Sequence, residues 1–285
     1  MKKLNKKKIK WTIREVERRD VGVWTIAQQN NITPRWAREL PKKYKNKEII
    51  LRKPGRKPKP ITKEERTIVI ETYKEYFVCA TMMEQILNEK GIHIGHNKIH
   101  RIMLEKGLAK KEKNKQKIRR YKCYERKHSN SLWHTDWLQY KVRWYILFED
   151  DASRFITGSG MFPNRSSNNA WKVFKKTIKY GIPKQLHSDN DSTFRANEQK
   201  GKRKGECDYQ KKIKEIGVQQ IFARVHRPQG NGKMEKLNGT IKKLMRKGLS
   251  FDNAIKHYNY KKPHLGLRNG KLRTPYRAFL DKMRN

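Results

Sequence analysis

The order of strands and helices that follows Ser129 constrains the fold more than any other feature of the sequence. There the apolar pattern changes from helical to alternating, which predicts three strands in succession. Helices then alternate with two further strands. Strands joined as hairpins, followed by alternating helices and strands, predict one mixed five-stranded sheet with flanking helices. The five strands are expected over residues 131–140, 142–148, 155–161, 184–187 and 218–222.

Three acidic residues lie in separate elements of this pattern. Asp136 is in the middle of the first strand, and Asp189 is at the tip of the fourth, where the chain turns. Glu235 is in the first turns of a helix that follows a loop rich in proline and glycine. Hard divalent cations prefer oxygen ligands, so three converging carboxylates would suit metal-assisted phosphoryl transfer. We therefore expect a metal site made of these three side chains.

The helix that carries Glu235 predicts open space around that side chain. Its neighbours on the same face, three residues before and four after, are Gly232 and Gly239. Lys242, one further turn along this face, is expected to meet a DNA strand. The alternative is that Glu235 is an ordinary solvated acid on a helix surface. The apolar stripe expected to face the core consists of Met234, Leu237, Ile241 and Leu244.

Other acidic residues close by are interpreted as parts of turns. Glu149, Asp150 and Asp151 cluster near the end of the second strand, and the family resemblance described below implies a turn ahead of the third strand there, not a site. Asp191 stands two residues after Asp189 and is an alternative ligand or a turn residue.

The charge of the chain indicates its class of partner. Its 71 basic and 27 acidic residues give a net charge of +44. Residues 1–128 hold 37 basic against 14 acidic residues, and residues 129–285 hold 34 against 13, so the excess is not confined to a tail. Such a field repels itself unless a polyanion neutralises it, so nucleic acid is the natural partner. The alternatives are a ribosomal-type protein or a membrane-surface protein.

No membrane location is expected. No stretch approaches the ~20 apolar residues of a membrane span, and no signal peptide is visible. Cys79, Cys123 and Cys207 are too far apart to form a metal site or a disulfide framework, which suits the reducing cytoplasm.

Residues 1–50 predict a first helix-turn-helix unit for DNA binding. Thr33 and Pro34 begin a helix that is expected to bury Trp36 and to expose Arg35 and Arg38 to a DNA groove. The alternative is a helical hairpin with a solvated charged face.

The next two segments continue the predicted DNA-binding region. Residues 51–60 form a basic linker rich in proline, with Arg56 expected in the minor groove. Residues 61–108 predict a second unit like a helix-turn-helix, which begins with a capping box at Thr62 and exposes Lys98 and Arg101. Residues 109–128, with ten basic residues against two acidic ones, are expected to form a basic linker along DNA.

Three short patterns, carried by the acidic residues, resemble the signatures of DDE transposases. These insertion-sequence enzymes of bacteria and archaea have a catalytic core similar to that of retroviral integrases, which is an α/β RNase H-like fold. The likeness covers roughly residues 133–279, and weaker likeness extends to the N-terminal half. The patterns are Trp-x-x-Asp at 133–136, Ser-Asp-Asn-x-x-x-Phe at 188–194 and Pro-Gln-x-Asn-Gly-x-x-Glu at 228–235.

The resemblance implies a complete reaction. Asp136, Asp189 and Glu235 would be the catalytic and metal-binding residues for two Mg²⁺ ions, with Mn²⁺ able to substitute. The enzyme would bind the terminal repeats of a mobile DNA element, cut phosphodiester bonds and join the 3′-hydroxyl ends to target DNA by transesterification. Lys233 and Lys236 would contact DNA together with Lys242.

The resemblance also implies how the chain is organised and where it acts. The helix-turn-helix units would precede a core over residues 129–250 and a C-terminal helical tail over 251–285 that packs on it. Pairing of two DNA ends would require a homo-oligomer. The location would be the prokaryotic cytoplasm, on the nucleoid.

Three positions depart from the family pattern. Asp191 stands where glycine is usual. Asp189 is still favoured as the ligand, because it occupies the position of the acid in the motif. The 45 residues between Asp189 and Glu235 exceed the usual spacing, because of a polar loop at 196–206. Lys236 replaces an arginine and loses bidentate phosphate contact.

Two other functions remain open from the sequence. The first is a DNA-binding regulator, derived from a transposase, that no longer cuts. The second is an RNase H-like nuclease that acts on RNA–DNA hybrids or junctions.

Overall fold

The computed structural model divides into two compact units, Met1–Pro60 and Ile61–Asn285, which are described separately. It describes residues 4–45, 47–51, 59–110, 125–196, 198–199, 202–203, 205–223, 232–269 and 271–283. Arg56 and the loop before Glu235, both singled out by the sequence analysis, lie outside these ranges. Among the helices described, none combines the length and the apolar character that a membrane span requires.

The first unit is a group of three helices, α1 (Lys6–Arg18), α2 (Val23–Asn30) and α3 (Pro34–Tyr44). Thr33 caps α3 by accepting a hydrogen bond from the Trp36 amide at 3.2 Å, as its place before Pro34 predicts. The helices meet over fully buried apolar side chains, whereas Trp36 is only half-buried. These buried side chains are Ile26, Ala27, Ala37 and Leu40.

The second unit begins with three more helices, α4 (Lys63–Tyr76), α5 (Ala80–Glu89) and α6 (His96–Glu105). The predicted capping box at the start of α4 is present, because Thr62 and Glu65 each bind the other's backbone amide. The helices enclose an apolar cluster centred on Val69, Met83, Leu87, Ile99 and Ile102.

A mixed five-stranded sheet forms the centre of the second unit and confirms the predicted fold class. Its strand order is β3-β2-β1-β4-β7. The first three strands are antiparallel, while β4 pairs in parallel with both β1 and β7. The strands are β1 (Leu132–Tyr140), β2 (Arg143–Asp150), β3 (Ile156–Phe162), β4 (Gln185–Ser188) and β7 (Gln219–Phe222).

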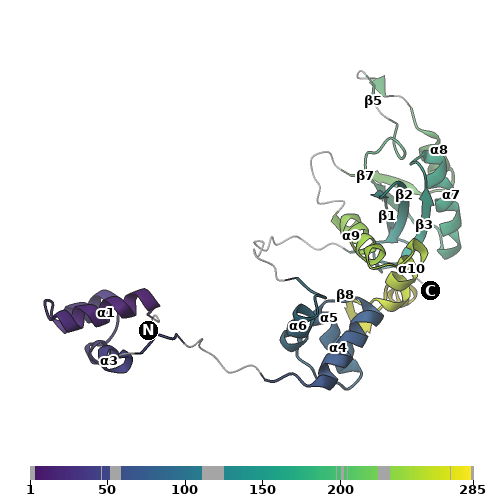
Figure 1. Cartoon of the computed structure of the whole chain (residues 1–285). Coiled ribbons are helices and arrows are strands. Elements are labelled where there is room, and N and C mark those ends of the chain that lie inside the picture. Colours follow the sequence, from purple (N-terminus) through teal and green to yellow (C-terminus); the bar gives the residue numbers. More distant parts are fainter. Residues whose placement is uncertain are drawn as a thin grey trace. The chain divides into compact units, whose positions relative to one another are not determined.

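Helices cover both faces of this sheet (Figure 1). On one face, α7 (Ser167–Thr177) and α8 (Asp208–Glu215) pack over Trp133, Ile146 and Phe148. On the other, α9 (Gly232–Arg246) packs its predicted apolar stripe over Leu138 and Leu147. The alternation of side chains along each strand therefore gives two cores. The short elements between are the 3₁₀ helix η1 (Ile178–Tyr180) and strands β5 (Glu198–Gln199) and β6 (Lys202–Arg203).

The C-terminal segment is more varied than a helical tail. Phe279 packs on Phe155 with ring centroids 4.8 Å apart, and the side chain of Asn259 makes two hydrogen bonds of 2.9 Å with the backbone of Ile156. These contacts hold the segment on the sheet. Its elements are α10 (Phe251–Lys256), the π-helix η3 (His257–Lys261), the hairpin β8 (His264–Asn269) and β9 (Lys271–Arg273), and α11 (Pro275–Asp281).

Helices α4–α6 belong to the same compact unit as the sheet, although the sequence predicts a separate domain over residues 61–108. The Lys247 ammonium lies over the rings of Tyr73 and Phe77, 4.2 and 4.6 Å from their centroids. The Leu272 amide donates to Glu89 at 2.8 Å. These contacts join segments far apart in the chain, which a reading of local patterns does not detect.

Replacing Phe174 by alanine should lower the free energy of unfolding by about 3–5 kcal/mol, because the change removes a large side chain from a packed core. The ring of Phe174 contacts those of Trp133, Phe148 and Trp171. Urea denaturation followed by circular dichroism measures the loss. Val142→Ala is the control, since Val142 is 84% exposed and its truncation should change stability by less than about 0.5 kcal/mol. Equal losses in both variants would contradict this account of the core.

Candidate active site

Pairing of two parallel strands brings Asp136 and Asp189 to the same level of the sheet. In the β1–β4 pair, His134 is the partner of His187. Asp136 and Asp189 each follow two residues later, so continuing the register sets them side by side. Side chains two residues apart point to one face, which here is the face that α9 covers. The rings of His134 and His187 pack together one layer below, with centroids 5.0 Å apart.

This pair of carboxylates is electrostatically unfavourable by itself. Burial and the neighbouring Asp189 raise the pKa of Asp136 to about 7, although an amide hydrogen bond from Asn238 at 3.0 Å opposes the shift. Burial also raises the pKa of Asp189. Two half-buried acids that resist ionisation together are stabilised by a bound cation, so the pair fits a metal site.

Glu235 lies in the first turn of α9 but is not gathered with the two aspartates. Its side chain is exposed, and the described residues contain no cluster of three His, Cys, Asp or Glu side chains close enough to share a metal ion. Asn238, one turn further along α9, is the residue that contacts Asp136. The face around Glu235 is open as predicted, since a Cβ added at Gly232 or Gly239 would meet nothing within 4 Å.

Asp191 has protein partners that account for its presence. Its carboxylate pairs with Arg165 and accepts a hydrogen bond from the Thr193 amide at 2.9 Å. Its own amide donates to Asp189 at 3.1 Å. Asp191 therefore shapes the turn after β4 and helps to orient Asp189.

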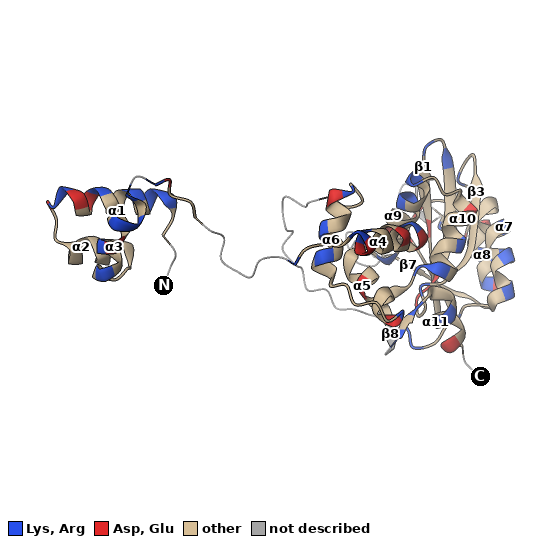
Figure 2. Ribbon diagram, turned by 60° about the horizontal axis from the view of Figure 1, so that its bottom comes forward, with Lys and Arg blue, Asp and Glu red and all other residues tan. Residues whose placement is uncertain are grey.

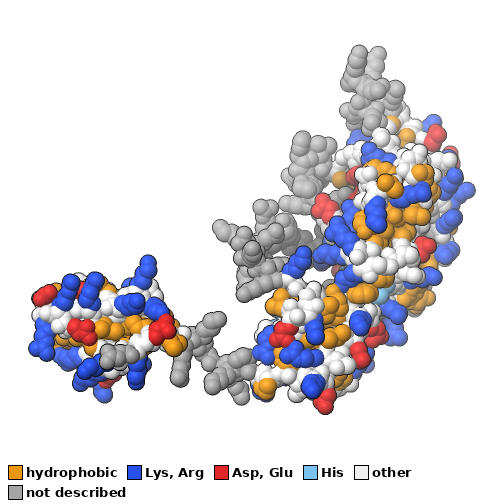
Figure 3. Space-filling view, in the orientation of Figure 1, with side chains coloured by type: hydrophobic (Ala, Val, Ile, Leu, Met, Phe, Trp, Pro, Cys, Tyr) orange, Lys and Arg blue, Asp and Glu red, His pale blue; other side chains and the backbone are white. Residues whose placement is uncertain are grey.

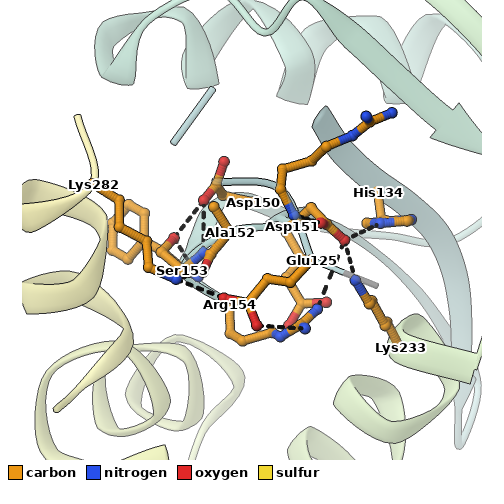
Figure 4. A network of polar contacts seen from close by, with 12 residues as sticks. Glu125, His134, Asp150, Asp151, Ala152, Ser153, Arg154, Lys233 and Lys282 are labelled. Atoms are coloured by element: carbon orange, nitrogen blue, oxygen red, sulfur yellow. Dashed lines mark hydrogen bonds and ion pairs between the residues drawn. The ribbon is translucent and has the colours of Figure 1, made fainter. Parts of the chain in front are cut away.

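The acidic run at the end of β2 is deeply buried, and only Asp151 lies in the turn, because Glu149 and Asp150 are the last residues of the strand. Asp150 accepts hydrogen bonds from the Asn130 amide at 2.8 Å and from the amide and hydroxyl of Ser153. Asp151 contacts His134 and Lys233 (Figure 4). Sequence reasoning missed this link, and it also missed Asn238. The sequence indicates Asn238 only weakly, as an amide side chain one helical turn after Glu235.

The residues predicted to contact DNA lie on both units, among many other basic side chains (Figures 2 and 3). Arg38 and Lys236 are exposed and Lys242 is half-buried. Arg35 pairs with Glu39 at 3.1 Å, and Arg101 lies 4.0 Å from Glu105. Two lysines contact acidic residues of the protein, namely Lys233 with Asp151 and Lys98 with Glu65. The outward orientation predicted for Lys98 is wrong, because α4 places Glu65 beside it.

Comparison with known proteins assigns the central segment to a family. Residues 126–228 match the integrase core domain. Over 115 residues the chain is 31% identical to the Pro-Pol polyprotein of feline foamy virus, a match that spans 40% of this chain and 9% of that polyprotein. Residues 126–228 are therefore similar to an integrase core domain, and the mixed sheet that they contribute to is the RNase H-like arrangement that the sequence signatures predict.

Solved structures of retroviral integrases are also similar to the chain. The catalytic core domain of BIV integrase is 18% identical, with a TM-score of 0.43 over 53% of this chain and 95% of that one. The core domain of HTLV-2 integrase, solved in complex with magnesium, is 18% identical, with a TM-score of 0.41 over 53% of this chain and 97% of that one.

Asp136→Asn should stabilise the metal-free protein at pH 8. A folded pKa of about 7 means that the folded chain retains a proton that the unfolded chain releases near pH 4. The free energy of unfolding therefore falls as pH rises from about 4 to 7, and asparagine removes this loss. One pKa unit corresponds to about 1.4 kcal/mol, and partial exposure reduces the effect, so we expect a gain of about 1–3 kcal/mol.

Thermal unfolding in a chelating buffer at pH 5 and pH 8 measures this gain, which should be larger at pH 8. The exposed Glu235, replaced by glutamine, is the control and should change little. An Asp136→Asn variant less stable than the wild type at pH 8 would show that the two acids do not repel each other.

Proposed function

We propose that this chain is a DDE transposase, which binds the ends of a mobile DNA element, cuts them and joins their 3′-hydroxyl groups to target DNA. The observation that carries the proposal is the Asp136–Asp189 pair, at one level of adjacent parallel strands inside an integrase core domain. The helix that crosses this pair also carries Glu235, where the transposase signature has its third acid.

In this mechanism, Asp136, Asp189 and Glu235 hold two Mg²⁺ ions, for which Mn²⁺ substitutes. When bound, such ions activate the attacking oxygen and stabilise the leaving one. Asn238 holds one oxygen of Asp136 and so fixes the direction in which the carboxylate points. The open face beside Gly232 and Gly239 leaves room for a DNA strand along α9.

The reaction exchanges one phosphodiester bond for another and needs no covalent protein intermediate. Water first attacks the phosphorus at the element end, and the 3′-oxygen leaves and takes up a proton. The new 3′-hydroxyl then attacks a phosphodiester of target DNA, and an oxygen of the target strand leaves in its turn. The second step breaks one phosphodiester bond and forms another. Positioning of the DNA strands and neutralisation of the phosphate charge are therefore sufficient for catalysis.

The charge of the chain supports DNA as the partner. An excess of 44 basic residues distributed over both units suits phosphate binding on several surfaces. In this proposal the helical unit with Arg35 and Arg38 reads the terminal repeats, and Arg56, Lys98, Arg101, Lys233, Lys236 and Lys242 remain predicted DNA contacts. Pairing of two element ends requires at least a dimer, acting on the nucleoid of a prokaryotic cell.

A second candidate is a DNA-binding protein derived from a transposase that no longer cuts. Among the residues that the structure describes, Glu235 is not clustered with the two aspartates, and this candidate is the one in which such a cluster is not needed. The two functions differ in whether divalent metal and element-end DNA together give cleavage.

Asp136→Asn should lower strand transfer by at least about 100-fold, since the loss of a charged ligand removes several kcal/mol of stabilisation from the reaction. Binding of element-end DNA should persist, because Asp136 is not among the basic side chains that contact phosphate. Transfer of a labelled 3′ end into a plasmid and a gel-shift assay measure the two properties. Asp252→Asn makes the same change at an exposed position of α10 and serves as the control. Retained transfer in Asp136→Asn would refute the assigned role.

Asp189→Asn and Asp191→Asn should differ sharply in the same assay. The first should be inactive because it removes a metal ligand. The second should keep at least about a tenth of wild-type activity, because it weakens a turn that other hydrogen bonds still hold. The reverse order of activities would assign the ligand to Asp191.

A further inference from the structure

Asp151 is completely buried, and its carboxylate joins two elements of the candidate active site (Figure 4). One oxygen, Oδ1, accepts a hydrogen bond from His134 Nε2 at 2.8 Å and also contacts the ammonium of Lys233. The other oxygen, Oδ2, accepts from the Arg126 amide at 2.8 Å. The guanidinium of Arg154 lies 3.8 Å from Oδ1.

The two side chains bound at Oδ1 stand in equivalent places in the chain. His134 precedes Asp136 by two residues on β1, and Lys233 precedes Glu235 by two residues at the start of α9. A single oxygen atom thus links the strand that carries one predicted ligand to the helix that carries another. The link forms next to the site, because the buried His134 lies two residues before Asp136 on the same face of β1.

The position of Glu235 depends on how α9 is held. In the part of the chain that the structure describes, no hydrogen bond or ion pair holds the Glu235 side chain, so the backbone of α9 decides where this carboxylate lies. Two polar contacts tie this end of α9 to β1, in addition to the packing of Met234 and Leu237 in the apolar cluster that contains Leu138. Lys233 reaches β1 through Asp151, and Asn238 binds Asp136 directly. Glu235 lies between these two contacts along the helix.

Stability alone does not explain this buried pair. An ion pair in the interior is expensive to desolvate, and apolar residues of similar size often serve stability as well. The neighbouring Asp150 has a different set of partners, because it accepts from Ser153 in the turn after β2 and from the Asn130 amide just before β1. It makes no contact with α9 in these hydrogen bonds. Asp151 differs because its partners lie on β1 and α9.

We propose that Asp151 is a positioning residue, which holds the start of α9 against β1. It keeps the Glu235 backbone anchored beside the Asp136–Asp189 pair, so that a metal ion bound by the pair can draw in the Glu235 carboxylate, which by itself stands outside the pair. This inference rests on the proposed function. It assigns Lys233 a role within the protein in addition to the DNA contact predicted from the sequence.

The test compares Asp151→Asn with Asp150→Asn in the full chain. Both changes remove one charge from a buried carboxylate without changing its shape. The readout is the Mn²⁺ concentration at the midpoint of the metal-induced rise in melting temperature, measured without DNA. Asp151→Asn should raise this midpoint by roughly tenfold, the lower end of what loss of an outer-shell partner costs. Asp150→Asn should lower the melting temperature and leave the midpoint within about twofold.

A second pair of variants keeps the test decisive if Asp151→Asn does not fold. Lys233→Met removes the contact from the α9 side, where the side chain is partly exposed, and should raise the midpoint similarly. Lys233→Arg keeps the charge and should restore most of the affinity. In the double variant Asp151→Asn/Lys233→Met, the midpoint should shift no further than in the more affected single variant, because both changes break one link.

The outcomes separate the two proposals. A wild-type chain that responds to Mn²⁺, together with unchanged midpoints in Asp151→Asn and Lys233→Met, would overturn the positioning role alone. Equal shifts in Asp151→Asn and Asp150→Asn would also overturn it, because they would reflect general damage to the turn. A wild-type chain without any metal response would overturn the proposed function, and the positioning role with it.

Discussion

The parallel pairing of β1 with β4 is the constraint on which the rest of the second unit depends. It brings together Asp136 and Asp189, which are separated in sequence by two strands and a helix, and it sets their side chains on one face. The antiparallel strands β2 and β3 support β1 from its other edge, and β7 supports β4. The register also stacks His134 on His187 directly below the acids. A slip of β4 by one residue would turn Asp189 toward the opposite face, where α7 and α8 pack, and separate it from Asp136.

This arrangement buries several carboxylates close together, and the contacts around each carboxylate determine whether its pKa is raised or lowered. The two aspartates resist ionisation together, whereas hydrogen bonds from His134 and Lys233 outweigh the effect of burial and hold the pKa of Asp151 well below its usual range. The site therefore contains one acid whose pKa is lowered by its partners and a pair of acids whose pKa values are raised by burial. This difference suits a chain in which the Asp151 carboxylate stabilises the fold and those of Asp136 and Asp189 bind metal.

Local patterns predicted much of the fold because they reflect interactions between neighbouring residues. The alternation after Ser129, the capping box at Thr62 and the apolar stripe around Leu237 all correspond to elements at the expected places. Contacts between distant segments were not predictable in the same way. Nothing near Lys98 in the sequence indicates that Glu65 lies beside it, and nothing near Lys247 indicates that it covers Tyr73. The hairpin of β8 and β9 was missed although the sequence signals it, since Asn269-Gly270 is a typical hairpin-turn sequence and Leu265, Leu267 and Leu272 alternate around it.

The sequence by itself determined the identity of the acids, the order of the strands and the excess of positive charge. These follow from residue types, from periodicity and from motifs short enough to read along the chain. Only the tertiary structure decided which acids meet, that Asn238 contacts Asp136, and that Asp151 is a buried link and not a solvated turn residue. The physical reason is that such contacts depend on strand register and helix packing, which are set by the whole core and not by the residues next to each acid.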